Sequence, residues 1–119
     1  MPILKLDAAI DATIKILNQP KKDIPVSNII EQLQSFGNKC IVQTMFLKGT
    51  YLGQTIDNTT PDELEAWERA IFAINPKQVM IYTIARNTPI DTIYKVSGEK
   101  LREIAARVEK HEIEVMVSE

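Results

Sequence analysis

The chain alternates short apolar runs with segments of helical periodicity, and the apolar runs predict four β-strands. Residues 39–46 and 78–84 are almost continuously apolar. Such runs are typical of strands buried on both faces of a parallel sheet. The other two predicted strands are residues 3–8 and 113–117.

Between the predicted strands, apolar residues recur every three or four positions, which is the spacing of one face of an α-helix. Four stripes have this spacing: Ile10, Ile14 and Leu17; Val26, Ile29, Ile30, Leu33 and Phe36; Leu64, Trp67, Ile71 and Ile74; and Leu101, Ile104, Ala105 and Val108. We expect each stripe to face the core.

Start and stop signals support these helices. Thr60 is placed to cap the third stripe, Pro61 suits a first helical position, and Glu63 completes a capping box. Ser97 opens the last helix in the same way. Gly37 follows the second stripe, where a glycine commonly ends a helix.

The order of elements predicts the fold class, an α/β domain built as a parallel (βα)3β unit over residues 1–119. Strands joined by helical crossovers run parallel, with right-handed connections. Such a unit is either a small doubly wound sheet or an arc cut from a (β/α) barrel. In both cases, chemistry gathers at the carboxyl ends of the strands.

Net charge and hydropathy argue against two classes of function, nucleic-acid binding and membrane spanning. The net charge of −2 gives no basic footprint for nucleic acid, and no apolar stretch is long enough to span a membrane. The first residues do not resemble a signal peptide, so we expect a cytoplasmic protein. The single cysteine, Cys40, allows no internal disulfide and no all-cysteine metal site from this chain alone.

Two charged residues interrupt the first predicted strand. Period-2 alternation puts Lys5 and Asp7 on one face, with Leu4 and Leu6 on the other. Charges are rarely buried unless they are paired. The two residues therefore form either a structural ion pair or a polar floor for a ligand.

Further candidates lie along or just beyond the middle strands. A buried Gln43 or Tyr82 needs hydrogen-bond partners, which a neighbouring strand or a ligand could supply. Arg86 follows a strand, where it would bind an anion or form a surface salt bridge. The segment 46–60 is long for a loop between a strand and a helix, and long loops are often functional.

Several runs of residues resemble radical S-adenosylmethionine proteins, in particular an Fe–S oxidoreductase-like subgroup. These runs are KLDA at 5–8 with NQP at 18–20, QTMFLKG at 43–49 with DNTT at 57–60, and PKQVMIYTIAR at 76–86 with TP at 88–89. The resemblance covers essentially the whole chain. It implies the C-terminal part of a partial (β/α)6 barrel.

In that family, a three-cysteine loop holds a [4Fe-4S] cluster that cleaves S-adenosylmethionine to a radical. The resemblance implies that the cofactor contacts Lys5, Asp7, Gln43, Thr44, Phe46 and Tyr82, and that Arg86 binds substrate. Cys40 does not belong to the cluster motif, and no metal ligand is expected in this chain. The chain alone is therefore expected to be inactive and to hold neither the cluster nor S-adenosylmethionine, and its main partner is expected to be the missing N-terminal half of the barrel.

Other hypotheses remain open at this point. One is a non-enzymatic, flavodoxin-like module that binds a nucleotide or a protein partner at its strand ends. Another is a homo-oligomer, because an arc of barrel leaves two sheet edges unpaired. Strand order separates a barrel arc from a flavodoxin-like sheet, since only the latter reverses direction along the sheet. The substrate, a small molecule or a peptide, is not identified by these residues.

Overall fold

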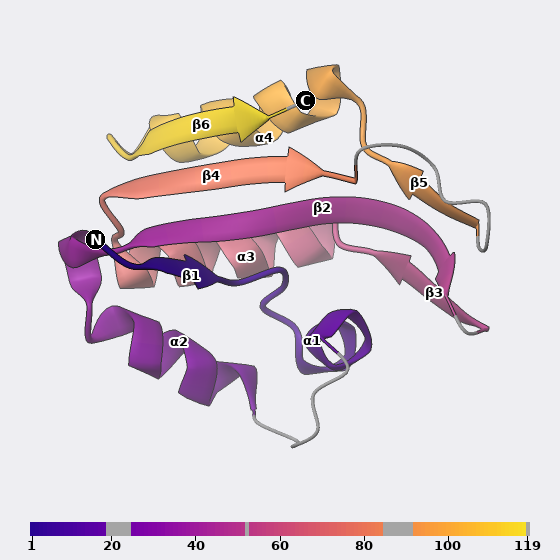
Figure 1. The fold of residues 1–119 in the computed structure, drawn as a ribbon, viewed down its shortest axis with the longest axis horizontal. Coiled ribbons are helices and arrows are strands. Elements are labelled where there is room, and N and C mark those ends of the chain that lie inside the picture. Colours follow the sequence, from indigo (N-terminus) through magenta and orange to yellow (C-terminus); the bar gives the residue numbers. More distant parts are fainter. Residues whose placement is uncertain (19–24, 52, 85–91, 119) are drawn as a thin grey trace.

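The computed structural model describes residues 1–18, 25–51, 53–84 and 92–118. Helices and strands alternate along the chain (Figure 1). The elements are β1 (Ile3–Lys5), α1 (Asp11–Asn18), α2 (Val26–Gln34), the short 3-10 helix η1 (Gly37–Lys39), β2 (Ile41–Tyr51), β3 (Gln54–Asp57), α3 (Pro61–Ile74), β4 (Gln78–Thr83), β5 (Thr92–Lys95), α4 (Gly98–Glu109) and β6 (Glu114–Ser118).

Strands β1, β2, β4 and β6 form a parallel sheet in that order. They correspond to the four strands predicted from the apolar runs, and they confirm the parallel α/β fold. Their order is sequential, as in an arc of a barrel, without the reversal of a flavodoxin-like sheet.

The segment 46–60, which the sequence predicts as a long loop, is mainly a β-hairpin. Strand β2 continues beyond the parallel sheet to Tyr51, and this extension pairs antiparallel with β3 on one side and with β5 on the other. The extension carries no run of apolar residues, because its chain has left the buried part of the sheet. The predicted loop is therefore corrected to an antiparallel ribbon at the carboxyl end of β2.

The helix starts are confirmed by their capping bonds. The Thr60 hydroxyl accepts a hydrogen bond from the backbone N–H of Glu63 at 3.3 Å, and Pro61 occupies the first turn of α3. The Ser97 hydroxyl accepts from the backbone N–H of Lys100 at 3.2 Å. These bonds satisfy amide groups that have no partner within the helix.

Helix α2 ends earlier than its apolar stripe predicts. Its C-cap is Ser35, and Phe36 lies beyond the helix with 42% of its surface exposed. Gly37 has a φ of +53°, in the left-handed region that favours glycine. The glycine thus turns the chain into η1, two residues after the α2 cap.

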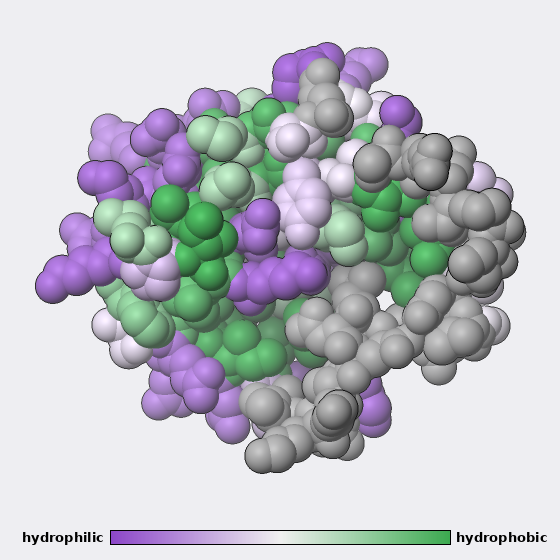
Figure 2. Space-filling model, in the orientation of Figure 1, coloured by the Kyte–Doolittle hydropathy of each residue, from purple (hydrophilic) through white to green (hydrophobic). Residues whose placement is uncertain are grey.

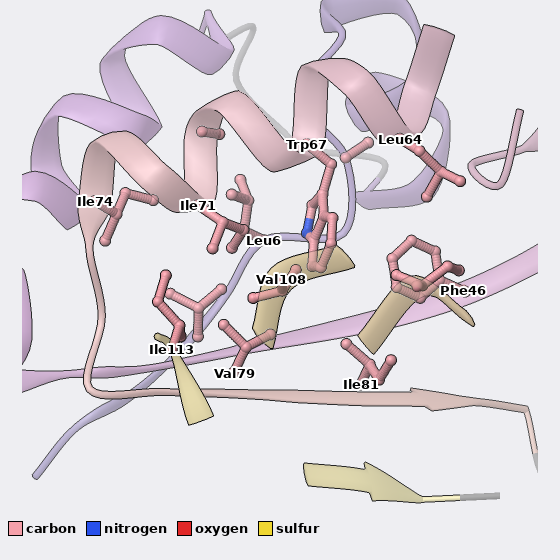
Figure 3. Close-up of a cluster of buried hydrophobic side chains, with 14 of the residues drawn as sticks. Leu6, Phe46, Leu64, Trp67, Ile71, Ile74, Val79, Ile81, Val108 and Ile113 are labelled. Atoms are coloured by element: carbon pink, nitrogen blue, oxygen red, sulfur yellow. The ribbon is translucent and has the colours of Figure 1, made fainter. Parts of the chain in front are cut away.

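The core lies on one face of the parallel sheet, beneath α3 and α4 (Figure 3). In Figure 1, these two helices lie behind the sheet, and no described helix crosses in front of β2, β4 and β6. The largest fully buried side chains are Trp67, Phe46, Leu6, Leu64, Ile71, Ile74, Ile81, Leu101, Ile104, Val42, Val79 and Val108. No helix in the described part of the chain has the length and apolarity needed to cross a bilayer.

Candidate functional site

The face of the sheet opposite α3 and α4 carries the predicted polar residues, and we call it the open face. Cross-strand pairing aligns side chains of the same face into rows, one of which contains Lys5, Gln43, Met80 and Met116. The open face comprises Ile3, Lys5, Ile41, Gln43, Met45, Gln78, Met80, Tyr82, Glu114, Met116 and Ser118. Figure 2 shows apolar surface beside a hydrophilic strip in this orientation.

A hollow of about 190 Å³ lies towards the carboxyl ends of β2, β4 and β6. Its lining combines apolar and polar residues, namely Gln43, Met80, Ile81, Tyr82, Met116 and Ser118. Enclosed sites for drug-sized ligands measure roughly 300–1,000 Å³. The hollow can therefore hold one part of such a ligand and needs a second wall to enclose the rest.

Gln43 and Tyr82 bring hydrogen-bonding groups into this hollow. Both residues are half-buried, and neither side chain is hydrogen-bonded to another group within the described residues. An amide both donates and accepts, as does a phenolic hydroxyl. The pair can therefore bind a ligand that carries both donors and acceptors, while Met80 and Met116 supply adaptable apolar contact.

Lys5 and Asp7 form an ion pair beside the hollow, with 3.4 Å between Lys5 Nζ and Asp7 Oδ2. Asp7 is only 3% exposed, and its Oδ1 accepts a hydrogen bond from the backbone N–H of Met45 at 2.9 Å. The Lys5 side chain is 56% exposed. Asp7 thus holds the chain just after β1 against β2. The exposed ammonium group of Lys5 can still donate hydrogen bonds to solvent or to a ligand.

Asn58 is a buried polar residue that the sequence does not single out. Its Nδ2 donates to the backbone oxygens of Asp7 at 2.8 Å and Met45 at 2.9 Å. Its Oδ1 accepts from the backbone N–H of Leu47 at 3.0 Å. Asparagine is common in turns, so an asparagine directly after a hairpin does not by itself predict these long-range hydrogen bonds.

Thr44 and Phe46 lie on the helix-covered face, away from the other predicted cofactor residues. The Thr44 hydroxyl accepts from Trp67 Nε1 at 3.0 Å and donates to the backbone oxygen of Leu6 at 2.7 Å. Phe46 packs edge-to-face on Trp67, with ring centroids 5.1 Å apart. Both residues are fully buried, so we do not include them in the candidate site.

Two further sequence features lie away from the hollow. Arg86, the predicted substrate-binding residue, lies outside the described residues. Cys40 is buried just before β2, at the opposite end from the hollow, and burial raises the pKa of its thiol. Within the described residues, no group of three or more histidine, cysteine, aspartate or glutamate side chains could hold a metal ion.

Comparisons with known proteins support the fold and leave the family open. No protein-family model matches the sequence, and no curated protein matches it. The chain is similar to the crystal structure of a domain of pyruvate-formate lyase-activating enzyme from Bacteroides vulgatus, with a TM-score of 0.70 and 7% sequence identity. The match covers 98% of this chain but 66% of that domain, so the chain spans less than two thirds of it. At this sequence identity the likeness is one of fold alone.

Proposed function

We propose that this chain forms one wall of a barrel lumen that binds S-adenosylmethionine, as the C-terminal portion of a radical S-adenosylmethionine enzyme. The observation that carries this proposal is the hollow on the open face, which Gln43 lines from within the parallel part of β2 and Tyr82 lines near the carboxyl end of β4. Ligands of barrel and α/β proteins bind at that end. The similarity in fold to a domain of an activating enzyme supports the same class.

The donor set of the hollow fits part of S-adenosylmethionine. That cofactor combines an adenine ring, a ribose and an amino-acid group, so it offers donors, acceptors and apolar surface together. Gln43 and Tyr82 would hydrogen-bond its polar edge, and Met80 and Met116 would pack against its flat or aliphatic parts. In the radical family, this cofactor supplies the radical that removes a hydrogen atom from substrate.

The [4Fe-4S] cluster of the family does not fit this chain. A cluster of this kind is held by several thiolates, whereas the chain has one cysteine. Cys40 is also fully buried, at the wrong end of β2 for the hollow. We therefore assign cluster binding to another segment or polypeptide, and we assign this chain a ligand-contacting role without catalysis of its own.

Titration of the isotope-labelled chain with S-adenosylmethionine, followed by NMR, tests the binding role. We expect amide shifts to concentrate at Gln43, Met80, Tyr82 and Ser118. Replacing Gln43→Leu should weaken binding about fivefold to tenfold, the effect of losing one hydrogen bond to the ligand. Shifts confined to the helix-covered face, or no shifts at all, would refute the role.

A matched control comes from the same face. Gln78 lies two residues before Met80 on β4, at the amino end of the open face, away from the hollow. The Gln78→Leu variant should therefore bind S-adenosylmethionine like the unmodified chain. Equal weakening by both variants would show that the amide in the hollow has no particular role.

Incubation of the chain with iron and sulfide under reducing conditions tests the assignment of the cluster elsewhere. We expect no absorbance from a cuboidal cluster on the isolated chain. Formation of a stable cluster would contradict this part of the proposal and would leave the ligand titration unaffected.

A further inference from the structure

Strand β6 lies at an outer edge of the parallel sheet (Figure 1). Among the described strands, it is hydrogen-bonded to β4 alone. The outer side of an edge strand presents a row of backbone N–H and C=O groups that have no strand partner, and these groups can pair with another chain. Native proteins limit such pairing by making edge strands very short or by placing proline and charged residues on them.

The two edges of this sheet differ in such protection. Strand β1 has three residues, directly follows Pro2 and carries Lys5. Strand β6 has five residues, contains no proline and has one charged residue, Glu114, at its first position. The β6 edge is therefore the one that is available for pairing.

The apolar residues of β6 are incompletely covered. Val115 and Val117 pack against the core but remain half-buried. Their partners on β4, Val79 and Ile81, are fully buried. Met116 lies on the open face and is 50% exposed. A further strand beside β6 would remove apolar surface of all three β6 residues from water, which favours its addition.

The residue pattern of β6 reads the same in both directions. Met116 is flanked by two valines, and these are flanked by the polar residues Glu114 and Ser118. A two-fold interface requires a surface that is complementary to itself. We propose that β6 pairs antiparallel with β6 of a second copy of this chain, about a two-fold axis that passes Met116 perpendicular to the sheet.

This register gives favourable cross-strand pairs. Val115 of one copy lies opposite Val117 of the other, and Met116 lies opposite Met116. Glu114 lies opposite Ser118, whose hydroxyl can donate a hydrogen bond to the carboxylate. Glu114 Oε1 already accepts from Gln78 Nε2 at 3.4 Å, but a carboxylate has further lone pairs.

The two faces of the sheet exclude other registers. The proposed axis keeps α4 of both copies on the same side of the joined sheet, so a residue of the helix-covered face pairs only with a residue of that face. The register must therefore centre on a residue, and only Met116 allows all five residues of β6 to pair. Centring on Glu114 would place two carboxylates opposite each other, which is destabilising.

The length of β6 predicts a weak dimer. Antiparallel pairing of five residues supplies about four to six backbone hydrogen bonds. The buried surface is much smaller than the roughly 1,600 Å² of a standard protein interface. The dimer should therefore form towards millimolar concentration and dissociate on dilution. The inference does not rest on the proposed function, because it concerns the chain without ligand.

Sedimentation equilibrium of the unliganded chain, over a micromolar to millimolar range, tests the proposal. Met116 meets its own counterpart at the axis, so Met116→Lys and Met116→Glu should each weaken dimerisation about fivefold or more by placing like charges opposite each other. An equimolar mixture of the two variants should form a mixed dimer. Two controls should dimerise normally: Met45→Lys on the open face, and Ile3→Lys on the β1 edge.

Four outcomes would overturn the proposal: a monomer at every concentration, dimerisation that survives Met116→Lys, failure of the mixed pair to associate, or loss of the dimer in either control. Circular dichroism must first show that each variant folds. The unmodified chain provides an independent measurement, because amides of β6 should exchange more slowly at millimolar than at micromolar concentration. Equal exchange at both concentrations would also contradict pairing through β6.

Discussion

Three buried polar residues, Asp7, Thr44 and Asn58, join the sheet to the elements around it. Each one bonds to backbone or side-chain groups that lie far away in sequence. Thr44 links the sheet to Trp67 of α3, whereas Asn58 links the end of the hairpin to Asp7, just after β1, and to the middle of β2. Buried polar groups cost stability unless they are paired, so these bonds select one register between neighbouring elements.

Replacing Asn58→Ala should lower the free energy of unfolding by about 1–3 kcal/mol, because the change leaves buried backbone groups of Asp7, Met45 and Leu47 without partners. Urea unfolding followed by tryptophan fluorescence measures the difference. Asn38→Ala serves as the control, since Asn38 is exposed in η1 and its replacement should change stability little. Equal stability of the two variants would refute the role of Asn58.

At the scale of elements, the first turn of α3 also holds α1. The Thr13 hydroxyl of α1 donates to Glu63 Oε2, while Glu63 Oε1 is buried with no hydrogen-bond partner in the described structure. Desolvation by burial raises the pKa of Glu63, and the charges of Asp57 and Asp62 add to this effect. The hydrogen bond from Thr13 opposes it. The contact between α1 and α3 is therefore sensitive to the charge of one carboxyl group.

The raised pKa of Glu63 fixes the sign of a pH effect. A carboxyl group whose pKa is higher in the folded chain than in the unfolded chain stabilises the fold when the pH is below the ordinary pKa of 4.5. This stabilisation is lost as the pH rises through the pKa of the folded chain. The neutral variant Glu63→Gln should therefore become more stable relative to the unmodified chain as the pH rises from 4 towards 7. Thermal unfolding of both chains at several pH values measures this difference. Glu99→Gln, in the first turn of α4, is the control. A difference that shrinks with rising pH would contradict this expectation.

At the scale of the whole molecule, strand β2 is the centre of the fold. Its first part pairs with β1 and β4, and its extension pairs with β3 and β5. Among the described strands, β1 and β6 each have one partner. The central strands of the parallel sheet are therefore hydrogen-bonded on both sides, whereas its edge strands β1 and β6 are hydrogen-bonded on one side only. The open face includes residues of the central strands and of the edge strands.

Hydrogen exchange should follow this arrangement. Amides in residues 42–46 of β2 and 79–81 of β4 should exchange most slowly, because they open only with the core. Amides of β1 and β6 should exchange faster at the edges. Mass spectrometry measures the difference in exchange. Edge strands as well protected as β2 would show that the sheet is covered by something other than its described neighbours.

The local parts of this architecture follow from the sequence. The starts of α3 and α4 could be predicted because Thr60 and Ser97 bond to amides three residues away. The four parallel strands could be predicted because burial leaves an apolar run wherever a strand crosses the core. Lys5 and Asp7 could be placed side by side because strand side chains alternate with a period of two, and the two residues form an ion pair.

Other features required the folded chain, because they depend on residues that meet only in space. Alternation alone does not say which face of β2 the helices cover. The family resemblance implies that Thr44 and Phe46 contact the cofactor, whereas in the structure both contact Trp67. Asn58 bonds to a backbone group that lies 51 positions away in sequence. The sequence by itself thus determined the four parallel strands and most helices, through local spacing and burial, and left the order of the strands open. Only the tertiary structure decided which face is open and where its hollow lies, because α3 and α4 pack on one side of the sheet and no described helix covers the other.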